Sequence, residues 1–340
     1  MCACLKSSFS CIIFFYMRSR STLYVKLCVL CIVLCVFIWR YSRKNGERAA
    51  VCWEDVTDAE RLSCRPVCPS GTFGLPGMSY CHDLLLCKDI KYEVHVLDLL
   101  ASGTVKNVYI AKWKHHTVVL SNLTEARLEP DFQHNLQMYQ LLGNVDYTPQ
   151  YIGSCNNTLV TEYFTLGSAA ELHSLFDTKL VRYNVLSRRF SLCLSYVTIL
   201  KYLHTHSRVM CDSNTLLKAL SQYLIYPDLT LRLNDMDALP YATHTEKAAC
   251  GSPPLQGELL APEQRGALLH ESLCTTACDI WKIPDVCLWF LGKTREAESF
   301  KFHLFSIHRR CKLQKPEQRP SAEQVLKDYQ RVWQEWMRGL

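Results

Sequence analysis

The chain has 340 residues, of which 49% are hydrophobic and 21% charged, and its formal net charge is +6 at pH 7. This composition is that of a globular protein, and the length suffices for a body of roughly 250 residues plus an appendage. The positive charges are dispersed, without the basic block that accompanies nucleic-acid binding, so we expect no nucleic-acid partner.

An apolar segment near the N-terminus predicts a membrane anchor. Residues 23–39 carry only the charge of Lys26, and as a helix they would span about 26 Å, close to the thickness of the endoplasmic-reticulum bilayer. A buried core helix is the first alternative, but Lys26 and Arg40 bracket the segment as interfacial anchors do. A cleaved signal peptide is the second, but no small-x-small cleavage site follows Trp39. We therefore expect a cytoplasmic tail at 1–22 and an uncleaved transmembrane signal-anchor at 23–39.

Cysteines and glycosylation motifs indicate on which side of the membrane the body lies. Five of the 19 cysteines fall within 52–87, a segment too poor in core residues to fold without covalent staples. Asn122 and Asn156 each begin an N-x-Thr acceptor site. Because disulfides persist in the secretory pathway and N-glycans mark it, we expect a single-pass type II membrane protein whose body is lumenal.

The apolar pattern predicts a neck, a β-rich lobe and then a helical lobe. The neck, at 40–87, contains Pro-Gly and Ser-Gly turn signals. Segments rich in β-branched and aromatic residues follow, which indicates about five strands and one helix before a Gly-containing linker. Strands are expected from residue 94 onward, at 105–112, 117–120, 151–152 and 159–161, and helices at 128–142 and 190–204.

Two aspartates flank a regular strand pattern in the second half of the chain. Apolar and polar residues alternate over 229–234, which predicts a strand. Asp212 opens a polar loop before this strand, and Asp235 follows it directly. Two carboxylates in this order are typical of phosphoryl-transfer sites, in which one accepts a hydroxyl proton and the other holds magnesium on the ATP phosphates.

With these motifs in sequence order, the chain resembles the protein kinases from about residue 90 to 337. The segments that carry the resemblance are 101–108 as the glycine-rich loop, 159–163 as the hinge, 202–212 before the catalytic loop, 235–237 at D-F-G, 261–263 at A-P-E, 279–281 at D-I-W and Arg319 as the arginine that pairs with Glu263. The resemblance implies an α+β, bilobal protein-kinase-like fold at 88–340, with a β-rich N-lobe at 88–165 and a mainly helical C-lobe at 166–340.

The resemblance also implies the cofactors, ATP and Mg²⁺, and the residues of the site. Asp212 and Lys106 would be catalytic, and Asp235 and Gln222 would bind the metal. The residues that would contact the nucleotide are Ala101, Gly103, Lys106, Val108 and Glu162.

Several positions depart from the kinase pattern. Ser121 stands where the strand lysine is expected, and Lys106 takes the position of the third glycine of the loop. The with-no-lysine kinases show the same relocation, and a point charge needs only proximity to the phosphates. Asn135 falls at the place of the helix acid that usually pairs with the lysine.

The second metal ligand is the least certain match. Leu217 stands five residues after Asp212, where an amide is usual. If a five-residue insertion is allowed, Gln222 takes this place, because it lies 13 residues before Asp235. Asn214 is the competing candidate.

Local motifs narrow the resemblance to lumenal kinases that phosphorylate O-linked mannose. The matching features include C-D-S-N at 211–214, N-D-M-D-A-L-P at 234–240, L-A-P-E-Q at 260–264 and the neck cysteines Cys68, Cys81 and Cys87. This resemblance implies a type II enzyme of the endoplasmic-reticulum membrane. Its substrate would be the 6-hydroxyl of mannose in a GalNAc-GlcNAc-Man trisaccharide on α-dystroglycan, whose further glycosylation the phosphate would support.

The alternative function is that of a catalytically inactive lumenal pseudokinase, which would bind a glycan or a protein. The missing strand lysine, the missing His-Arg before Asp212 and the missing amide favour it. Against it, each essential charge has a substitute, and a module that only binds does not need both Asp212 and Asp235.

Two pairs of cysteines in the second half call for an assignment. Cys211 replaces the arginine that binds a phosphorylated activation loop in regulated kinases, and Cys250 lies inside that loop. In an oxidising compartment we expect a disulfide between them, with two separate buried thiols as the alternative. Cys274 and Cys278 have the spacing of half a zinc site, but no second pair matches it, so we expect free or disulfide-bonded thiols.

Overall fold

The structure is a computed structural model that describes residues 50–339 except 59–61, 144–145, 251–255 and 266–272. The segment Ala50–Leu340 forms one compact unit. The predicted tail at 1–22 and anchor at 23–39 lie outside the described residues. Within the part of the chain that is described, no helix has the length and apolar character needed to cross a membrane.

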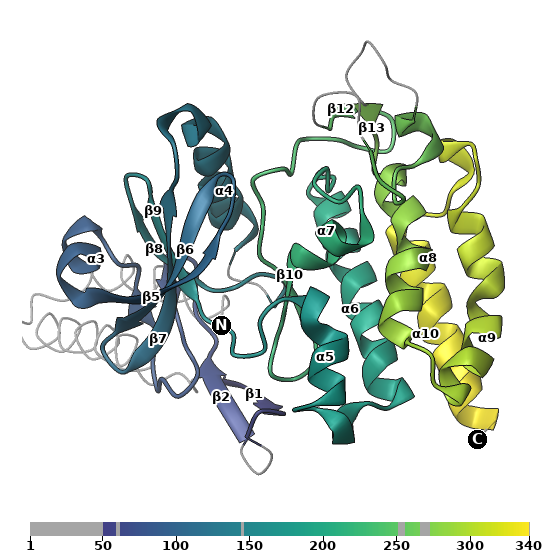
Figure 1. Ribbon diagram of the computed structural model, residues 1–340, viewed down its shortest axis with the longest axis horizontal. Coiled ribbons are helices and arrows are strands. Elements are labelled where there is room, and N and C mark those ends of the chain that lie inside the picture. The colour runs from purple at the N-terminus through teal and green to yellow at the C-terminus, as the bar shows by residue number, and fades with distance from the viewer. Residues whose placement is uncertain (1–49, 59–61, 144–145, 251–255, 266–272, 340) are drawn as a thin grey trace, which may run out of the picture. The chain divides into compact units, whose positions relative to one another are not determined.

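A five-stranded antiparallel sheet forms the first lobe, in the order β5-β6-β7-β9-β8. Trp113 and Val118 of its central hairpin are buried against Ile152 and Val160, so one face of the sheet forms a core. The α4 helix belongs to the same lobe (Figure 1). The predicted β-rich lobe with one helix is therefore confirmed. Its elements are β5 (Val94–Ser102), β6 (Lys106–Trp113), β7 (His116–Leu123), α4 (Glu129–Leu142), β8 (Tyr151–Cys155) and β9 (Thr158–Glu162).

The described part of the neck is built on short hairpins and disulfides. Phe73 and Leu85 are buried in the same core as the face of the sheet, which fixes the neck to the lobe. Three disulfides join Cys52 to Cys64, Cys68 to Cys81 and Cys87 to Cys155, and the last ties the neck to β8. The elements are β1 (Ala50–Glu54), β2 (Leu62–Pro66), β3 (Thr72–Phe73), β4 (His82–Asp83) and α3 (Cys87–Glu93).

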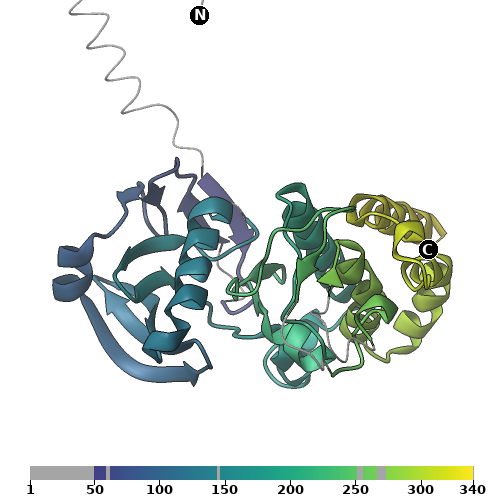
Figure 2. The same cartoon turned by 90° about the horizontal axis from the view of Figure 1, so that it is seen from above.

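The second lobe is helical, and Figures 1 and 2 show its helices gathered on the side of the unit away from the sheet. Phe190 of α6 packs against Phe300 of α9 and Trp333 of α10, with ring centroids 4.8 and 5.2 Å apart. Ser321 and Gln324 cap the start of α10 reciprocally, which satisfies two backbone donors. The helices are α5 (Leu172–Asp177), α6 (Leu186–Thr205), α7 (Leu216–Ser221), α8 (Ala277–Leu291), α9 (Arg295–Cys311) and α10 (Ala322–Gly339).

Two short antiparallel pairs complete this lobe, and one of them corrects a predicted boundary. They are β10 (Tyr223–Ile225) with β11 (Leu231–Leu233), and β12 (Ala248–Ala249) with β13 (Leu273–Cys274). The strand predicted at 229–234 is wrong at its start, because Leu229 has a φ of +62° and lies in the turn between β10 and β11. The Leu229 side chain is nonetheless fully buried. The apolar alternation that predicted the strand therefore included a buried turn residue before the strand itself.

Candidate active site

Lys106 and Asp235 come from different lobes and form an ion pair. Lys106 is the first residue of β6, and its Nζ lies 2.7 Å from Asp235 Oδ1. Burial opposes the ionisation of Asp235, but the ammonium of Lys106 outweighs it and holds the pKa of Asp235 below its usual value. The loop before β6 closes where the Gly103 N–H donates to the Lys106 carbonyl at 3.0 Å.

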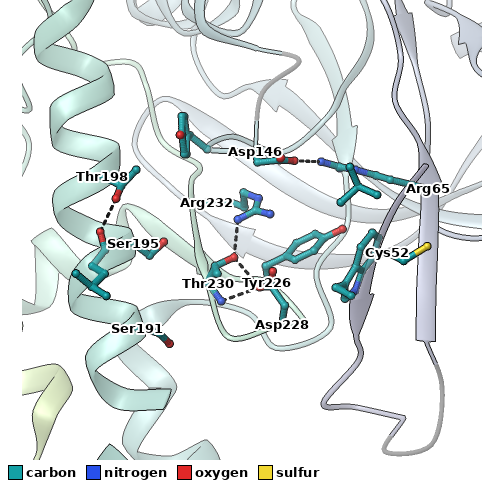
Figure 3. Close-up of a pocket in the computed structure, with 14 residues that line it drawn as sticks. Cys52, Arg65, Asp146, Ser191, Ser195, Thr198, Tyr226, Asp228, Thr230 and Arg232 are labelled. Carbon is teal, nitrogen blue, oxygen red and sulfur yellow. Dashed lines mark hydrogen bonds and ion pairs between the residues drawn. The ribbon is translucent and has the colours of Figure 1, made fainter. Parts of the chain in front are cut away.

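The predicted nucleotide-contacting residues divide between this loop and the hinge. Ala101 pairs with Val108 across β5 and β6, next to Gly103. Glu162, at the end of β9, is only 3% exposed, and its Oε2 lies 3.3 Å from Nη1 of Arg65 in the neck. Arg65 also binds Asp146 at 2.7 Å, as Figure 3 shows. The carboxylate of Glu162 therefore faces the neck, and burial raises its pKa against the effect of Arg65.

Asn135 of α4 stands where most kinases carry an acid, and it has a different partner. The side chain is fully buried, and its Oδ1 accepts a hydrogen bond from the Met236 N–H at 3.1 Å. One turn further along α4, Tyr139 donates to the carbonyl of Asn234 at 2.9 Å. A neutral amide can be buried here without a cation, whereas a carboxylate would require one. The helix therefore binds the backbone around Asp235 instead of Lys106.

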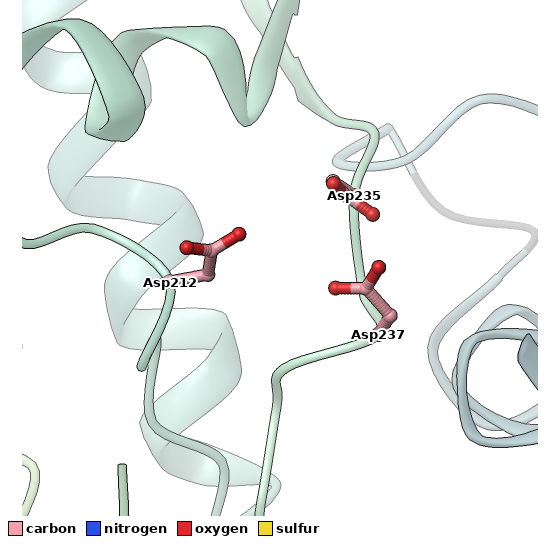
Figure 4. Close-up of side chains that lie close together, drawn as sticks. All are labelled: Asp212, Asp235 and Asp237. Atoms are coloured by element: carbon pink, nitrogen blue, oxygen red, sulfur yellow. The ribbon is translucent and has the colours of Figure 1, made fainter. Parts of the chain in front are cut away.

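Three aspartates converge from two neighbouring segments. One carboxylate oxygen each of Asp212, Asp235 and Asp237 lies within 4.8 Å of the others, and Figure 4 shows Asp212 on one segment facing the other two. The Cys211 N–H donates to the Ala238 carbonyl at 3.2 Å, which holds the two segments together. Burial and the neighbouring Asp235 raise the pKa of Asp237 to about 7.

Lys218 completes the group, although no sequence motif pointed to it. It lies on α7, in the stretch inserted between Asp212 and β10, and its Nζ lies 2.7 Å from Asp212 Oδ2. Burial by itself lowers the pKa of Lys218, but the hydrogen bond that Lys218 donates to Asp212 and the negative charge of Asp212 raise it above the usual value. With every group ionised, three carboxylates and two ammonium groups leave one negative charge in excess.

The two candidates for a second metal ligand have other partners. Gln222 is 2% exposed, and its Nε2 donates to the Lys218 carbonyl at 3.2 Å. Its backbone carbonyl accepts from the Asn234 N–H at 2.9 Å, next to Asp235. The side-chain amide of Asn214 donates to the carbonyl of Gln256.

Sequence reasoning did not identify Asp237 as a residue of the site. The signal for it was the second acid of the motif Asp235-Met236-Asp237, at the position where kinases carry glycine.

The segment between Asp235 and Glu263 is anchored at its middle and its end. The predicted Cys211–Cys250 disulfide is present, with the two Cα atoms 4.9 Å apart, and Cys274 and Cys278 are also joined. Glu263 accepts hydrogen bonds from both terminal nitrogens of Arg319, at 2.6 and 2.7 Å, as the A-P-E resemblance implied. Because the Arg319 guanidinium is fully buried, this two-point pair is a strong anchor.

Asp279 of α8 binds the backbone just before Asp212. It is fully buried and accepts from the Met210 N–H at 3.1 Å, while Lys282 of the same helix donates to the Met210 carbonyl at 2.8 Å. The ammonium of Lys282 and the hydrogen bonds hold the pKa of Asp279 low against the effect of burial. The backbone that carries Asp212 is thus held on both its donor and its acceptor side.

A sheet lobe with a lysine paired to an acid of the helical lobe, and an activation segment closed by an arginine–glutamate pair, define the class of protein-kinase-like proteins. No protein-family model matches the sequence. The chain is 39% identical over 282 residues to "Protein O-mannose kinase" of Homo sapiens, covering 78% of this chain and 80% of the relative. The proteins of the same name from Gallus gallus and Xenopus laevis are 39% and 38% identical with the same coverage. The chain belongs to the protein O-mannose kinase family.

Proposed function

We propose that the protein is an ATP-dependent kinase that transfers a phosphate to the 6-hydroxyl of O-linked mannose on a glycoprotein. The observation that carries the proposal is the arrangement of Asp212 opposite the Lys106–Asp235 pair, with carboxylate oxygens of the three aspartates within 4.8 Å. The relatives' printed names supply the acceptor, O-mannose. The finer assignment is the mannose of a GalNAc-GlcNAc-Man trisaccharide on α-dystroglycan.

The residues of the site divide the work of phosphoryl transfer. Asp212 orients the acceptor hydroxyl and accepts its proton. Lys218, held by Asp212 at 2.7 Å, and Lys106 supply positive charge where charge builds up on the transferred phosphate. Positioning and electrostatics of this kind account for most of the catalysis in phosphoryl transfer.

The residues fit a hard divalent cation. Carboxylate oxygens are the ligands that Mg²⁺ prefers, and with every group ionised the three aspartates and two lysines carry one negative charge in excess. Asp235 and Asp237 would hold the ion, because both carboxylates project from the same three-residue segment. Bound Mg²⁺ would neutralise phosphate charge.

The proposed location is the endoplasmic-reticulum membrane, with the catalytic body in the lumen. Support comes from the five disulfides of the described residues, which need an oxidising compartment. The sequons at Asn122 and Asn156 and the apolar segment at 23–39 point in the same direction.

One experiment tests the activity directly. The purified protein is incubated with γ-labelled ATP, Mg²⁺ and the O-mannosyl trisaccharide, and the label in the glycan is counted. We expect transfer with the natural chain and none with Asp212→Asn, which keeps the shape of the side chain and removes the base. If neither protein transfers phosphate while the glycan still binds, the protein is a pseudokinase and the proposal is wrong.

A further inference from the structure

The neck hairpin β1–β2 contacts both lobes of the protein, and it contains none of the three aspartates of the candidate active site. Its strands pair antiparallel, and the Cys52–Cys64 disulfide joins them at directly opposite positions. Figure 3 shows the hairpin beside the turn between β10 and β11 of the helical lobe. Any effect of the hairpin on the site therefore passes through the elements that it contacts.

A buried ion pair joins the hairpin to the hinge. Arg65 of β2 is 6% exposed, and its guanidinium lies 3.3 Å from Glu162 Oε2 and 2.7 Å from Asp146 Oδ1. Glu162 is the last residue of β9, where the chain leaves the sheet. Its Oε2 also accepts from the Gln150 N–H at 3.2 Å, and its own N–H donates to the Gln150 carbonyl at 3.0 Å. Arg65 thus holds the carboxylate that ties the start of the hinge to the segment before β8.

Aromatic packing and a backbone hydrogen bond join the hairpin to the helical lobe. The ring centroids of Trp53 in β1 and Tyr226 in the β10–β11 turn are 4.9 Å apart, and those of Tyr226 and Phe164 are 5.3 Å apart. These three residues form one buried cluster. Just after β1, the Val56 N–H donates to the Pro227 carbonyl at 2.9 Å. Because Phe164 lies just beyond β9, the hairpin, the hinge and the turn pack together.

A second ion pair joins the hairpin to α6. Glu54 ends β1, and its carboxylate lies 2.7 Å from Arg188 of α6 and accepts from the Tyr183 hydroxyl at 3.4 Å. Both partners of this pair are partly exposed, so it adds little stability by itself. Its position matters more, because β1 carries this contact to the helical lobe while β2 carries Arg65. The disulfide joins these two strands, so a movement of one lobe against the other would break contacts of the hairpin.

The carboxylate of Glu162 depends on Arg65. Burial raises the pKa of Glu162, and the Arg65 guanidinium acts in the opposite direction. Glu162 Oε1 is buried without a partner among the described residues, so Oε2 makes the contacts of this carboxylate. Removing one partner of a buried ion pair leaves the other charge uncompensated. Without Arg65, the carboxylate would turn toward water or take up a proton, and either change would alter the start of the hinge.

We propose that the neck hairpin fixes the hinge and the helical lobe in the geometry that binds the nucleotide, with Arg65 as a positioning residue that acts through Glu162. The proposal rests on the proposed kinase function, because it uses the nucleotide contact that the family resemblance implies for Glu162. Loosening the hairpin should therefore weaken the binding of ATP, whereas the transfer step from bound ATP should keep nearly its rate.

The first test replaces Arg65 in the purified full chain. Arg65→Gln removes the charge, and Arg65→Lys keeps it but loses the two-point geometry. We expect Arg65→Gln to raise the Kd and the KM for ATP about 5- to 20-fold, the size of a typical coupling between distant sites. Its kcat should stay within about two-fold of the natural value, and Arg65→Lys should recover part of the affinity. Nucleotide-binding titrations and steady-state kinetics with the glycan acceptor measure these changes.

The second test leaves every charge in place and does not depend on how well Arg65→Gln folds. Cys52→Ser/Cys64→Ser removes the disulfide of the hairpin. Cys68→Ser/Cys81→Ser is the matched control, because it removes another neck disulfide with a sequence separation of 13 residues instead of 12. The chain-entropy model gives the two bonds nearly equal contributions to stability. Only the first variant should show faster hydrogen exchange at residues 158–165, measured without ATP, and a KM for ATP raised about 3- to 10-fold.

Four outcomes would overturn the inference. Unchanged exchange at residues 158–165 in Cys52→Ser/Cys64→Ser would show that the hinge does not depend on the hairpin. Equal rises of the KM for ATP in the two disulfide variants would assign the effect to a general loss of stability. A fall in kcat with unchanged ATP affinity in Arg65→Gln would place the effect on the transfer step. An absence of nucleotide binding by the natural chain would leave nothing for the hinge to position.

Failure of the proposed function has a different signature. In that case the natural chain binds ATP but transfers no phosphate to the glycan. The Kd for ATP and the hydrogen exchange of the hinge then still decide the inference, because neither measurement requires transfer.

Discussion

Lys218 Nζ lies 2.7 Å from Asp212 Oδ2, so the proposed catalytic base has a lysine as its direct partner. This lysine is on α7, a six-residue helix that Thr215 begins by accepting a hydrogen bond from the Lys218 N–H. The helix occupies the insertion that displaces the usual amide. The insertion therefore adds a positive charge next to the base.

Replacing Lys218 tests this partnership. We expect Lys218→Met to lower kcat about 10- to 100-fold and to leave the KM for ATP nearly unchanged, because the charge acts on the transferred phosphate. Lys218→Arg should recover part of the loss. Steady-state kinetics with the glycan acceptor is the measurement. A rise in KM for ATP with an unchanged kcat would instead mean that Lys218 serves ground-state binding.

Removing the charge of Lys106 should slow transfer by two to three orders of magnitude, that is about 10²–10³-fold. Lys106→Ala deletes the ammonium that lies 2.7 Å from Asp235, and losing one preorganised charge in an active site costs about 10²–10³ in rate. Lys112→Ala, an exposed lysine on the same strand, is the matched control and should be fully active. Near-normal turnover in Lys106→Ala, with intact folding by circular dichroism, would show that the relocated lysine has another role.

The metal ligands can be separated by titrating Mg²⁺ into nucleotide-binding assays. We expect Asp235→Ala to lose Mg²⁺-dependent nucleotide binding, whereas Asp212→Asn keeps it. Asp237→Asn should raise the Mg²⁺ requirement about 10- to 100-fold, because it removes a carboxylate of the group. Gln222→Ala should change it less, because it removes a neutral amide and not a charged carboxylate. If Gln222→Ala raised the Mg²⁺ requirement more than Asp237→Asn did, Gln222 would be the second metal ligand.

The Cys211–Cys250 bond should stabilise the folded protein and hold the activation segment. It closes a separation of 39 residues, for which the chain-entropy estimate is about 3–4 kcal/mol. Cys211→Ser and Cys250→Ser should lower the free energy of unfolding by similar amounts, and the double variant should lose no more than either one. Peptide mapping under non-reducing conditions checks the bond itself. Finding either thiol free would refute it.

The stability of the folded protein should fall in mild acid through His308. Burial lowers the pKa of His308 to about 4, while the unfolded chain takes up this proton below about 6.5. The native state therefore binds fewer protons in this window, and its stability decreases as pH falls from 6.5 toward 4. Between pH 7 and pH 4.5, the free energy of unfolding should fall by about 2–3 kcal/mol because of His308.

The control for this effect is His308→Gln. In the natural chain the His308 imidazole lies 2.7 Å from the Tyr329 hydroxyl, and the Gln amide can bind this hydroxyl but does not titrate. Urea unfolding at the two pH values measures the difference. The variant should lose less stability than the natural chain over this range. Equal losses in both proteins would assign the acid sensitivity to other groups.

Local sequence pattern determined much of this protein. Strand periodicity and turn residues predicted the β-rich lobe and its helix, because these signals arise within ten or fifteen residues. The order of short motifs predicted that Lys106 and Asp235 would serve one site, although 129 residues separate them. The same order, with the expected compartment, predicted the Cys211–Cys250 bond.

Only the tertiary structure decided which partners these residues have. Lys218 meets Asp212 because a short helix folds back over the loop, and Glu162 turns to Arg65, 97 residues away in the neck. Periodicity reports which face of an element is buried. It carries no information on which distant side chain lies opposite. The hydrophobic effect stabilises any apolar contact and has no preferred direction, whereas hydrogen bonds and ion pairs depend on the final distances between elements.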